Sequence, residues 1–492
     1  MDQSEDSDSI LNHRVLLPDG TVTPMILTTD GWLQWSEKSQ RRLSIDKEVL
    51  GFSMDGPKIR IKALVEDRGG FRCFGNSGAL VRKEFVFQPL SEESRALWCL
   101  KLRECIDLLG RPKKLFVLVN PFGGKGAGSK IYRDEVKPIL EDAEINVTLQ
   151  ETKYQRHAEE VAYSLDFTNY DGIVCVSGDG ILVEVINGLL RRDDWVDAIK
   201  TPLGVVPAGT GNGMVKSLLH SIGDPCTARN ATLAIVRGHK CSLDVATISQ
   251  GEAKHFTVLM LAWGLVADID IESEKYRWMG SARLDIYALQ RIISLRHYRG
   301  GVSFVPAPGF EDYGEPTRYD YETASVVEVD KSDGVPISTQ RHGYEGPNIN
   351  LKDLEWRKFD GPFISVWLHN VPWGAENTLA APDAKDPPIW MPRLKVIIEP
   401  PVKENPIPND SSIVFEKSSL ESNDPNRVKA FVLKPGTRVE EPSKEGIIDA
   451  DGEILALGKG TLTTGQKTLM NYDELQISVH QGLATLFSPC RN

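Results

Sequence analysis

Residues 111–240 show the most regular alternation of hydrophobic and polar positions in the chain. Short apolar runs with the length of buried strands alternate with stretches whose apolar residues recur at helical spacing. This alternation is typical of a parallel sheet covered by helices on both faces, with ligands bound outside the carboxyl ends of the strands. The pattern predicts strands over 115–120, 146–152, 172–176 and 203–206, and helices over 130–141, 158–165, 182–190 and 213–220.

The preceding part of the chain is predicted to be β-rich. Residues 1–18 begin acidic and polar, so we expect a disordered N-terminus that is not a signal peptide. Within 19–110, strands closed by a terminal helix favour a small barrel of the pleckstrin-homology type. The strands are expected over 21–28, 31–34, 48–52, 59–64 and 84–87, and the helix over 91–109 with Leu97, Leu100, Cys105 and Leu108 on its apolar side.

Residues 241–485 are strand-rich and predict a second, mostly antiparallel domain. Two segments within it, 307–361 and 402–427, are rich in proline, serine and acidic residues and poor in apolar ones. We expect both segments to be mobile loops that carry no chemistry. The expected strands are 243–247, 256–262, 302–305, 364–368, 394–398, 430–433 and 475–479, with one helix over 282–297.

Composition excludes several classes of protein. The 492 residues carry a net charge of -12, whereas a nucleic-acid binder normally presents a basic face. The seven cysteines include no Cys-x-x-Cys pair, which favours reduced thiols in the cytoplasm and no zinc site. The longest apolar stretch, 256–267, is about half the ~20 residues that a membrane span needs, and we interpret it as a buried strand. We therefore expect a cytoplasmic protein whose contact with endomembranes or the plasma membrane is peripheral.

Three glycine-rich turns follow predicted strands of the 111–240 region. Glycine lets backbone N–H groups approach a ligand, and helix N-termini favour negative charge, so the three turns predict a phosphate site. The first is not a Walker A loop, because Gly126 stands where Ser or Thr is needed, and Ser129 breaks a dinucleotide fingerprint. The turns are Asn120-Pro121-Phe122-Gly123-Gly124-Lys125-Gly126, Ser177-Gly178-Asp179-Gly180 and Pro207-Ala208-Gly209-Thr210-Gly211-Asn212-Gly213.

Asp179 is the acidic residue within these turns, and its flanking glycines leave the carboxylate accessible. In phosphoryl transfer to a hydroxyl, a carboxylate near the acceptor oxygen takes the hydroxyl proton. The alternative is a helix cap, which is the commoner role for an aspartate in an isolated Gly-Asp-Gly. The combination of a phosphate cradle and a carboxylate predicts phosphoryl transfer to a hydroxyl.

In their order and spacing, the three turns resemble the catalytic domain found in diacylglycerol, ceramide and sphingosine kinases. A further stretch, 261–277, contains Ala262-Trp263-Gly264 and Asp268-Ile269-Asp270 and is similar to the sphingosine kinase signature. The resemblance is strong over 112–300, weaker over 363–392 and 429–485, and greatest to plant long-chain base kinases. It implies an NAD-kinase-like three-layer α/β nucleotide domain followed by an antiparallel β-sandwich domain that binds lipid, with ATP between them.

The same resemblance implies roles for individual residues. Asp179 would deprotonate the primary hydroxyl of the lipid, whose head group Asp270, Ser177, Gly178 and Gly180 would bind. No residue is expected to hold a metal of its own, because Mg²⁺ would arrive with the co-substrate ATP and neutralise its β- and γ-oxygens. At Phe122 relatives often carry a basic residue, so the absence of that charge weakens the expectation of one phosphate contact and leaves the class unchanged. The nucleotide would be bound by Asn120, Pro121, Phe122, Thr152, Glu184, Gly209, Thr210, Gly211, Arg277, Arg283, Asp451, Gly452 and Glu453.

The implied reaction is ATP-dependent phosphorylation of the C1 hydroxyl of a sphingoid base: sphingosine, dihydrosphingosine or 4-hydroxysphinganine. Asp270 fits this substrate, because the base carries an ammonium group beside the reacting hydroxyl and a charged hydrogen bond is worth roughly 1.5–3 kcal/mol. Ceramide and diacylglycerol lack that cation. Three alternatives stay open: a ceramide or diacylglycerol kinase, a catalytically silent adaptor that binds lipid through the N-terminal barrel, and a Rossmann oxidoreductase.

The predicted helix over 282–297 is amphipathic. This pattern equally favours ordinary core packing and a lid over the acyl chain of a lipid. Arg277 and Arg283 are six residues apart and therefore not on one helical face, so a loop must separate them if both reach a phosphate. The apolar positions of the helix are Leu284, Leu289, Ile292, Ile293 and Leu295.

Overall fold

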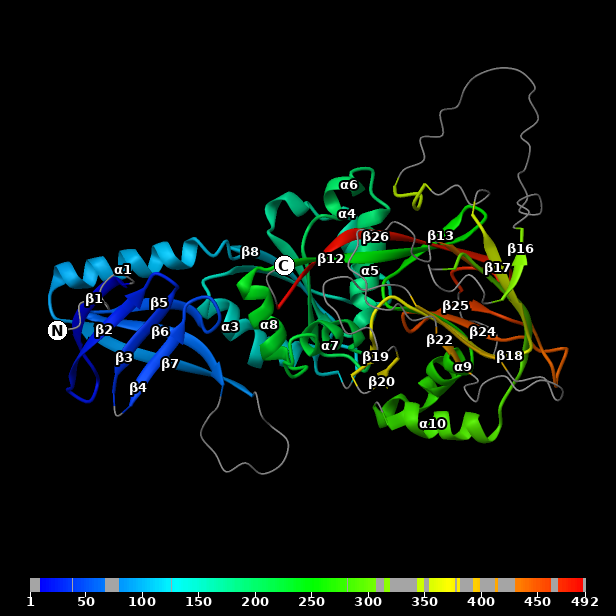
Figure 1. Cartoon of the computed structure of the whole chain (residues 1–492), viewed down its shortest axis with the longest axis horizontal. Helices are drawn as coiled ribbons and strands as arrows, with labels where there is room; N and C mark the ends of the chain where they lie inside the picture. Colours follow the sequence, from blue (N-terminus) through cyan, green and yellow to red (C-terminus); the bar gives the residue numbers. More distant parts are fainter. Residues whose placement is uncertain are drawn as a thin grey trace, which may run out of the picture.

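The chain folds into three parts arranged in a row along the long axis of the molecule (Figure 1). An N-terminal β region lies at one end, an α/β part at the centre and a strand-rich part at the other end. The computed structural model describes residues 9–37, 39–66, 79–124, 126–280, 282–306, 314–318, 343–348, 354–376, 378–380, 393–398, 412–414, 430–461 and 468–489.

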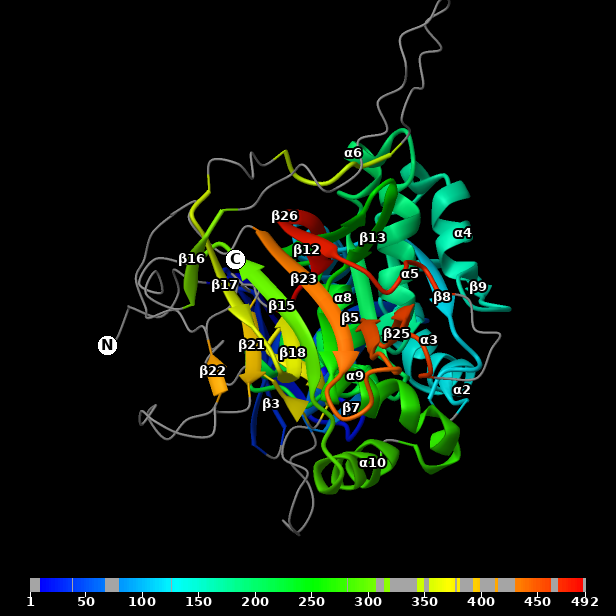
Figure 2. The ribbon, with the colours of Figure 1, turned by 90° about the vertical axis from the view of Figure 1, so that its right-hand side faces the viewer.

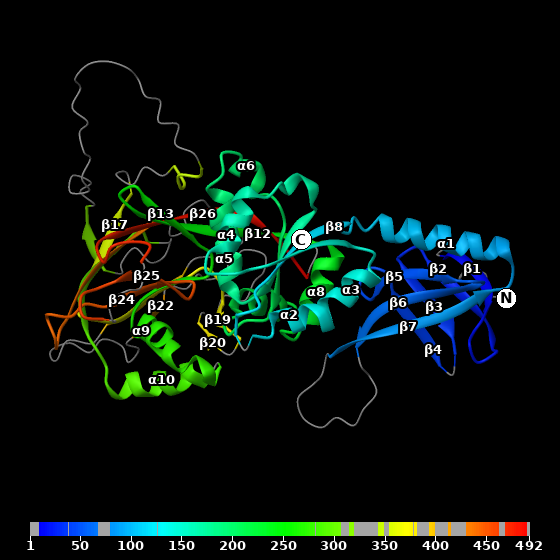
Figure 3. The same cartoon turned by 180° about the vertical axis from the view of Figure 1, so that it is seen from behind.

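The N-terminal region is a seven-stranded sheet in the order β4-β3-β2-β1-β7-β6-β5, with α1 (Glu92–Asp107) packed along it (Figure 3). Ser91 begins the helix, because its side chain accepts a hydrogen bond from the Ser94 N–H. The strands are β1 (Ser9–Leu16), β2 (Val22–Thr28), β3 (Trp32–Ser36), β4 (Gln40–Ser44), β5 (Val49–Asp55), β6 (Lys58–Glu66) and β7 (Leu80–Pro89).

Two predictions for this region are wrong. Strand β1 lies within 1–18, which was expected to be disordered, because apolar residues such as Val15 alternate with polar ones and are buried. Helix α1 buries Trp98, Leu102 and Ile106 and exposes Leu108, so its apolar face is not the predicted one. These three buried residues recur every four positions and therefore share one side of the helix.

The central part confirms the predicted parallel sheet, with the order β9-β8-β10-β11. Every residue of β10 and β11 is buried, as expected for strands covered on both faces. The strands are β8 (Lys114–Val119), β9 (Asn146–Glu151), β10 (Gly172–Ser177) and β11 (Leu203–Pro207). The helices are α2 (Gly128–Ile131), η1 (Tyr132–Val136), α3 (Lys137–Asp142), α4 (His157–Ser164), η2 (Phe167–Asn169), α5 (Asp179–Leu190), α6 (Trp195–Ala198), α7 (Gly213–His220) and α8 (Ala228–Arg237), of which η2, α6 and α8 were not predicted.

The strand-rich part continues the central sheet without a break. Figure 2 views the molecule from the end at which the strand-rich part lies. β26 (Leu475–Phe487) pairs antiparallel with β12 (Lys240–Gln250) and parallel with β11 through Leu203 and Leu486. The predicted boundary between 240 and 241 therefore cuts through a continuous sheet. The other elements are β13 (Ala253–Thr257), β14 (Met260–Gly264), α9 (Leu265–Glu272), η3 (Ser273–Met279), α10 (Ala282–Ile293), β15 (Tyr298–Phe304), β16 (Glu315–Thr317), β17 (Trp356–Asp360), β18 (Phe363–His369), β19 (Trp373–Ala375), β20 (Thr378–Leu379), β21 (Arg393–Ile398), β22 (Ser412–Val414), β23 (Ala430–Arg438), β24 (Ile447–Ala450) and β25 (Glu453–Leu457).

Three predictions for the later part of the chain need correction. The run 256–267 is not one strand: β13 ends at Thr257, β14 begins after a tight turn, and α9 starts at Leu265. The segments 307–361 and 402–427 are not wholly loops, because they contain β16, β17 and β22 and the buried Tyr344, while much of each lies outside the described residues. The helix expected over 282–297 ends at Ile293.

Candidate active site

The three glycine turns meet backbone to backbone at the carboxyl ends of β8, β10 and β11. A Cβ atom on Gly178 would lie 2.7 Å from the Gly211 carbonyl oxygen, and one on Gly124 would lie 2.9 Å from the Gly209 carbonyl carbon. Gly124 also has a φ of +56°, which glycine adopts readily. Only residues without a side chain permit this approach, so the glycines bring the three turns to one place.

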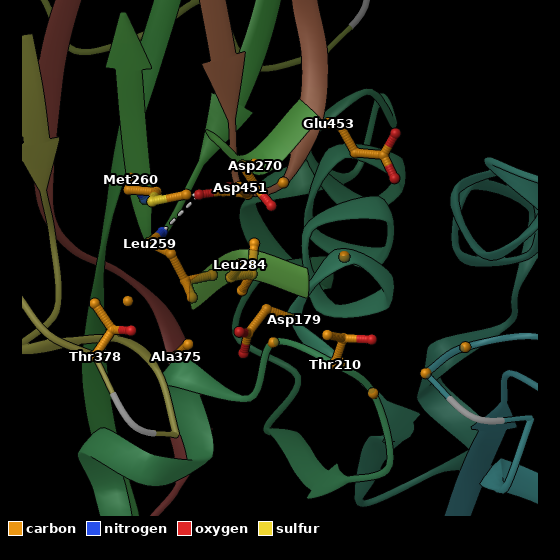
Figure 4. A pocket seen from close by; sticks show the side chains of 18 of the residues that line it. Asp179, Thr210, Leu259, Met260, Asp270, Leu284, Ala375, Thr378, Asp451 and Glu453 are labelled. Atoms are coloured by element: carbon orange, nitrogen blue, oxygen red, sulfur yellow. Dashed lines mark hydrogen bonds between the residues drawn. The ribbon is translucent and has the colours of Figure 1, made fainter. Parts of the chain in front are cut away.

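A cavity of about 440 Å³ separates these turns from the strand-rich part. In Figure 4, Asp179 and Thr210 lie on one side of it, Asp270 and Asp451 on the other. Residues far apart in the sequence therefore converge on one space large enough for a ligand. The predicted site residues that line the cavity are Asn120, Ser177, Gly178, Asp179, Gly180, Glu184, Gly209, Thr210, Gly211, Asp270, Arg283, Asp451, Gly452 and Glu453.

Asp179 is the first residue of α5, and its side chain reaches across to α7. Its carboxylate accepts hydrogen bonds from the N–H groups of Gly213 at 2.7 Å and Met214 at 3.0 Å. It therefore caps α7 rather than its own helix, and it also lines the cavity. Burial raises the pKa of Asp179 to about 6, against the opposing effect of the two N–H donors. A carboxylate with this pKa is ionised at neutral pH and basic enough to accept a proton.

Some predicted nucleotide ligands do not line this cavity. Pro121, Phe122 and Thr152 lie around a neighbouring depression instead, and Phe122 is 67% exposed. The side-chain oxygen of Asn120 accepts hydrogen bonds from the N–H groups of Phe122 and Gly123, so it shapes the first turn. The side chain of Arg277 is outside the described part of the chain. For these positions a nucleotide contact stays a prediction.

Glu184 and Glu453 stand at the edge of the cavity nearest α4. The Glu184 carboxylate accepts hydrogen bonds from the N–H groups of Arg156 and Ala158, both at 3.0 Å, and so caps α4. Burial raises its pKa to about 7, and the charge of Glu453 adds to this effect. Glu453 itself accepts a hydrogen bond from the Gln155 side chain at 2.5 Å. The late Asp-Gly-Glu element thus contacts the central part through Glu453, and its contact with the nucleotide stays a prediction.

Asp451 holds the turn between β13 and β14. Its carboxylate accepts hydrogen bonds from the Thr257 hydroxyl at 2.6 Å and from the N–H groups of Val258, Leu259 and Met260 at 2.7–3.1 Å. Figure 4 shows part of this arrangement beside the cavity. The residue predicted to bind nucleotide therefore organises the backbone that forms one wall of the site.

Arg283 and Asp270 are neighbours on the strand-rich side of the cavity. The Arg283 guanidinium is 2.5 Å from Glu274, 2.8 Å from the Ser273 hydroxyl and 3.9 Å from the Asp270 carboxylate. The side chain of Asp270 stays 23% exposed. Arg283 is therefore neutralised by protein carboxylates, and its predicted contact with ATP phosphates requires some of these partners to be exchanged.

Helix α10 presents polar residues to the protein and apolar residues to solvent. Its buried side includes Arg283, Arg291 and Tyr287, whose hydroxyl donates to Glu272 at 2.6 Å. Leu284 and Ala288 face the cavity. The outer face of α10 consists of Ile286, Leu289, Ile292 and Ile293. These residues are 51–79% exposed and do not pack in a core, so the core-packing alternative is wrong.

The hairpin of β19 and β20 also lines the cavity, and sequence reasoning missed it. Gly374, Ala375 and Thr378 belong to the lining, and Glu376 accepts a hydrogen bond from the Asn212 side chain at 3.0 Å. A Cβ atom on Gly213 would lie 3.0 Å from the Gly374 carbonyl carbon, so this hairpin packs directly on α7. No motif marks it, because its role depends on a contact between segments far apart in sequence.

Residues 114–248 match the family model of the diacylglycerol kinase catalytic domain. With a carboxylate among converging glycine turns, this match defines the class: a lipid kinase whose fold combines mixed sheets with an N-terminal antiparallel β region. Sphingosine kinase 1 of Arabidopsis thaliana is 55% identical to the chain, over 98% of the chain and 97% of its own length. Sphingosine kinase 2 of the same plant is 54% identical, over 96% of the chain and 96% of its own length. The chain belongs to the sphingosine kinase family.

Two further proteins match a smaller part of the chain or share less sequence identity with it. Human sphingosine kinase 1 is 40% identical over 40% of this chain and 53% of its own length. The crystal structure of a diacylglycerol kinase from Bacillus anthracis covers 77% of this chain and 97% of its own, with 17% identity and a TM-score of 0.42. In the described part of the chain no helix is long and apolar enough to span a bilayer, and no three His, Cys, Asp or Glu side chains are grouped as a metal site.

Proposed function

We propose that this protein transfers the γ-phosphate of ATP to the C1 hydroxyl of a sphingoid base, with Asp179 as the general base. The observation that carries the proposal is the cavity that lies between the three glycine turns, which hold Asp179, and Asp270 on the facing wall. This arrangement offers backbone N–H groups to phosphates and a carboxylate to an ammonium group. The sphingosine kinase relatives support the same substrate class.

In the proposed reaction the substrates are a sphingoid base and the complex of Mg²⁺ with ATP. The C1 oxygen attacks the γ-phosphorus, the bond to the β–γ bridging oxygen breaks, and the hydroxyl proton passes to Asp179. The glycine turns orient the phosphates, since the transition state is loose and needs positioning more than covalent chemistry. Asp270 holds the ammonium group, which fixes the neighbouring hydroxyl near Asp179.

A substrate panel tests this function against its alternatives. We expect labelling by radioactive ATP of sphingosine, dihydrosphingosine and 4-hydroxysphinganine, and much weaker labelling of ceramide and diacylglycerol, which lack the cation. Loss of one charged hydrogen bond to Asp270 corresponds to roughly tenfold or more in kcat/KM. Preferential labelling of ceramide or diacylglycerol would replace the proposal by that kinase activity. Lipid binding without any turnover would favour the silent adaptor.

We also propose that the outer face of α10 contacts the membrane from which the lipid is taken. These side chains are apolar and exposed, while Leu284 and Ala288 of the same helix line the cavity. A helix with one face in the bilayer interface and another at the binding site provides a route for a long-chain lipid. Membrane contact through this face is peripheral, and movement of α10 is the proposed lid action.

The double variant Leu289→Glu and Ile293→Glu tests this contact. We expect the double variant to raise KM for sphingosine in lipid vesicles about tenfold, since each side chain loses the free energy of burial in an apolar phase. KM for a short-chain base in free solution should not change. The matched control is Val196→Glu, an exposed apolar residue of α6 on the opposite side of the molecule (Figure 1). Equal effects on vesicle-bound and soluble substrates would remove the membrane role.

Each of the three parts of the chain is proposed to be a domain of a known kind. We propose that the N-terminal sheet with α1 is a pleckstrin-homology-like barrel, that the central parallel sheet with its helices is an NAD-kinase-like nucleotide domain and that the strand-rich part is a β-sandwich domain that binds lipid. The N-terminal sheet with its closing helix, the parallel sheet and the antiparallel strands around β15 support these names.

A further inference from the structure

A second carboxyl group stands behind Asp270, and no sequence motif indicated it. Asp449 lies on β24, which pairs with β14 through Asp449 and Ala262. Its side chain is fully enclosed, with 0% exposure. Neither carboxyl oxygen meets an N–H or O–H donor among the described residues. Among the described residues, the Asp449 carboxyl group makes a side-chain hydrogen bond with the carboxyl group of Asp270.

Two carboxyl groups in contact inside a protein cannot both be ionised at low cost, so one proton is shared between them. The surroundings decide where that proton resides. Burial raises the pKa of Asp270 as well, but Asp270 lines the cavity and has the Arg283 guanidinium 3.9 Å away, which opposes this effect and favours its ionised form. Burial, together with the negative charges of Asp270, Asp451 and Glu453, raises the pKa of Asp449 well above its usual value. The proton therefore belongs on Asp449.

We propose that Asp449 is a positioning residue of the head-group site: its protonated carboxyl group donates a hydrogen bond to Asp270. The pair then carries one negative charge, which faces the cavity and matches the single ammonium group of a sphingoid base. A lipid without a cation leaves that charge unpaired, which adds to the discrimination against ceramide and diacylglycerol. This inference rests on the proposed function and adds a residue that sets its specificity.

Two variants separate the hydrogen bond from the bulk of the side chain. Asp449→Ala removes the donor, so we expect KM for sphingosine to rise roughly tenfold, with kcat and the KM for ATP unchanged. The acidic rise of this KM should also begin at a higher pH, because a lost donor raises the pKa of Asp270. Asp449→Asn keeps a neutral donor and should stay within threefold of wild type. Glu274 and Arg283, the other charged groups facing Asp270, are unchanged in both variants.

Two results would overturn the proposal: a KM as high in Asp449→Asn as in Asp449→Ala, or an unaltered KM and pH profile in Asp449→Ala. Infrared difference spectroscopy gives a readout that needs neither turnover nor a folded alanine variant. The difference spectrum between wild type and Asp449→Asn should contain the C=O stretch of one protonated carboxyl group, a band that Glu184 and Asp179 cannot supply because both proteins contain them. A difference spectrum without this band would also overturn the proposal. Asp360→Ala, at an exposed carboxylate of β17, is the matched control. Wild-type turnover of sphingosine, measured first, tests the proposed function separately.

Discussion

Asparagine in place of Asp179 should lower kcat at least ~100-fold, the scale of general-base assistance, while the fold and ATP binding are kept. The amide has nearly the same shape as the carboxylate and can still accept a hydrogen bond from the start of α7, where Gly213 and Met214 now donate. It cannot take a proton from the lipid hydroxyl. Steady-state kinetics with sphingosine, together with ATP titration, checks both halves of this expectation.

The pH dependence provides the control for this variant. The pKa of Asp179 is raised to about 6, so wild-type kcat should fall as the pH drops through about 6, and the residual rate of Asp179→Asn should lack that limb. Because the folded pKa exceeds the unfolded one, ionisation of Asp179 lowers stability as the pH rises from about 4 to 6. The asparagine variant should therefore melt no lower than wild type at pH 8. Near-wild-type turnover by Asp179→Asn would exclude Asp179 as the base.

The parts of the fold that sequence reasoning predicted correctly are those whose determinants are local. β10 and β11 are continuous apolar runs, and each is followed at once by a glycine turn and a helix. Parallel strands place their carboxyl ends at one edge, so the convergence of the three turns followed from the order of elements alone. The position of Asp179 at the cavity is a consequence of the same order.

The structural features that the sequence did not predict depend on contacts between residues far apart in the sequence. The run 256–267 has the composition of one strand, but Asp451 collects the N–H groups of Val258, Leu259 and Met260 and so imposes a turn there. Helix α10 has an ordinary amphipathic pattern, yet its polar face is the buried one, because carboxylates such as Glu272 pair with it. Hydrophobic periodicity carries no information on either contact.

Asp451 is the residue whose removal should cost the most stability among those that line the cavity. Alanine there would leave the N–H groups of Val258, Leu259 and Met260 without their acceptor, and each unsatisfied buried donor costs about 1–3 kcal/mol. Asp451 also has a φ of +54°, which aspartate and asparagine tolerate better than alanine. We therefore expect Asp451→Ala to destabilise the protein by on the order of 3 kcal/mol and to lower Tm by roughly 5 °C or more.

The effects of the substitution on Tm and on ATP affinity distinguish two roles for Asp451. If it organises the turn, Asp451→Ala lowers Tm and reduces activity together, and Asp451→Asn lies between it and wild type, since one amide oxygen still accepts. Asp197→Ala, at an exposed carboxylate of α6, should stay within about 0.5 kcal/mol of wild type. A wild-type Tm combined with a large loss of ATP affinity would instead make Asp451 a direct nucleotide ligand, as the motif implied. The outcome therefore decides between two roles for Asp451 in the late Asp-Gly-Glu element. Its carboxylate either contacts the nucleotide directly or holds the backbone that forms one wall of the cavity.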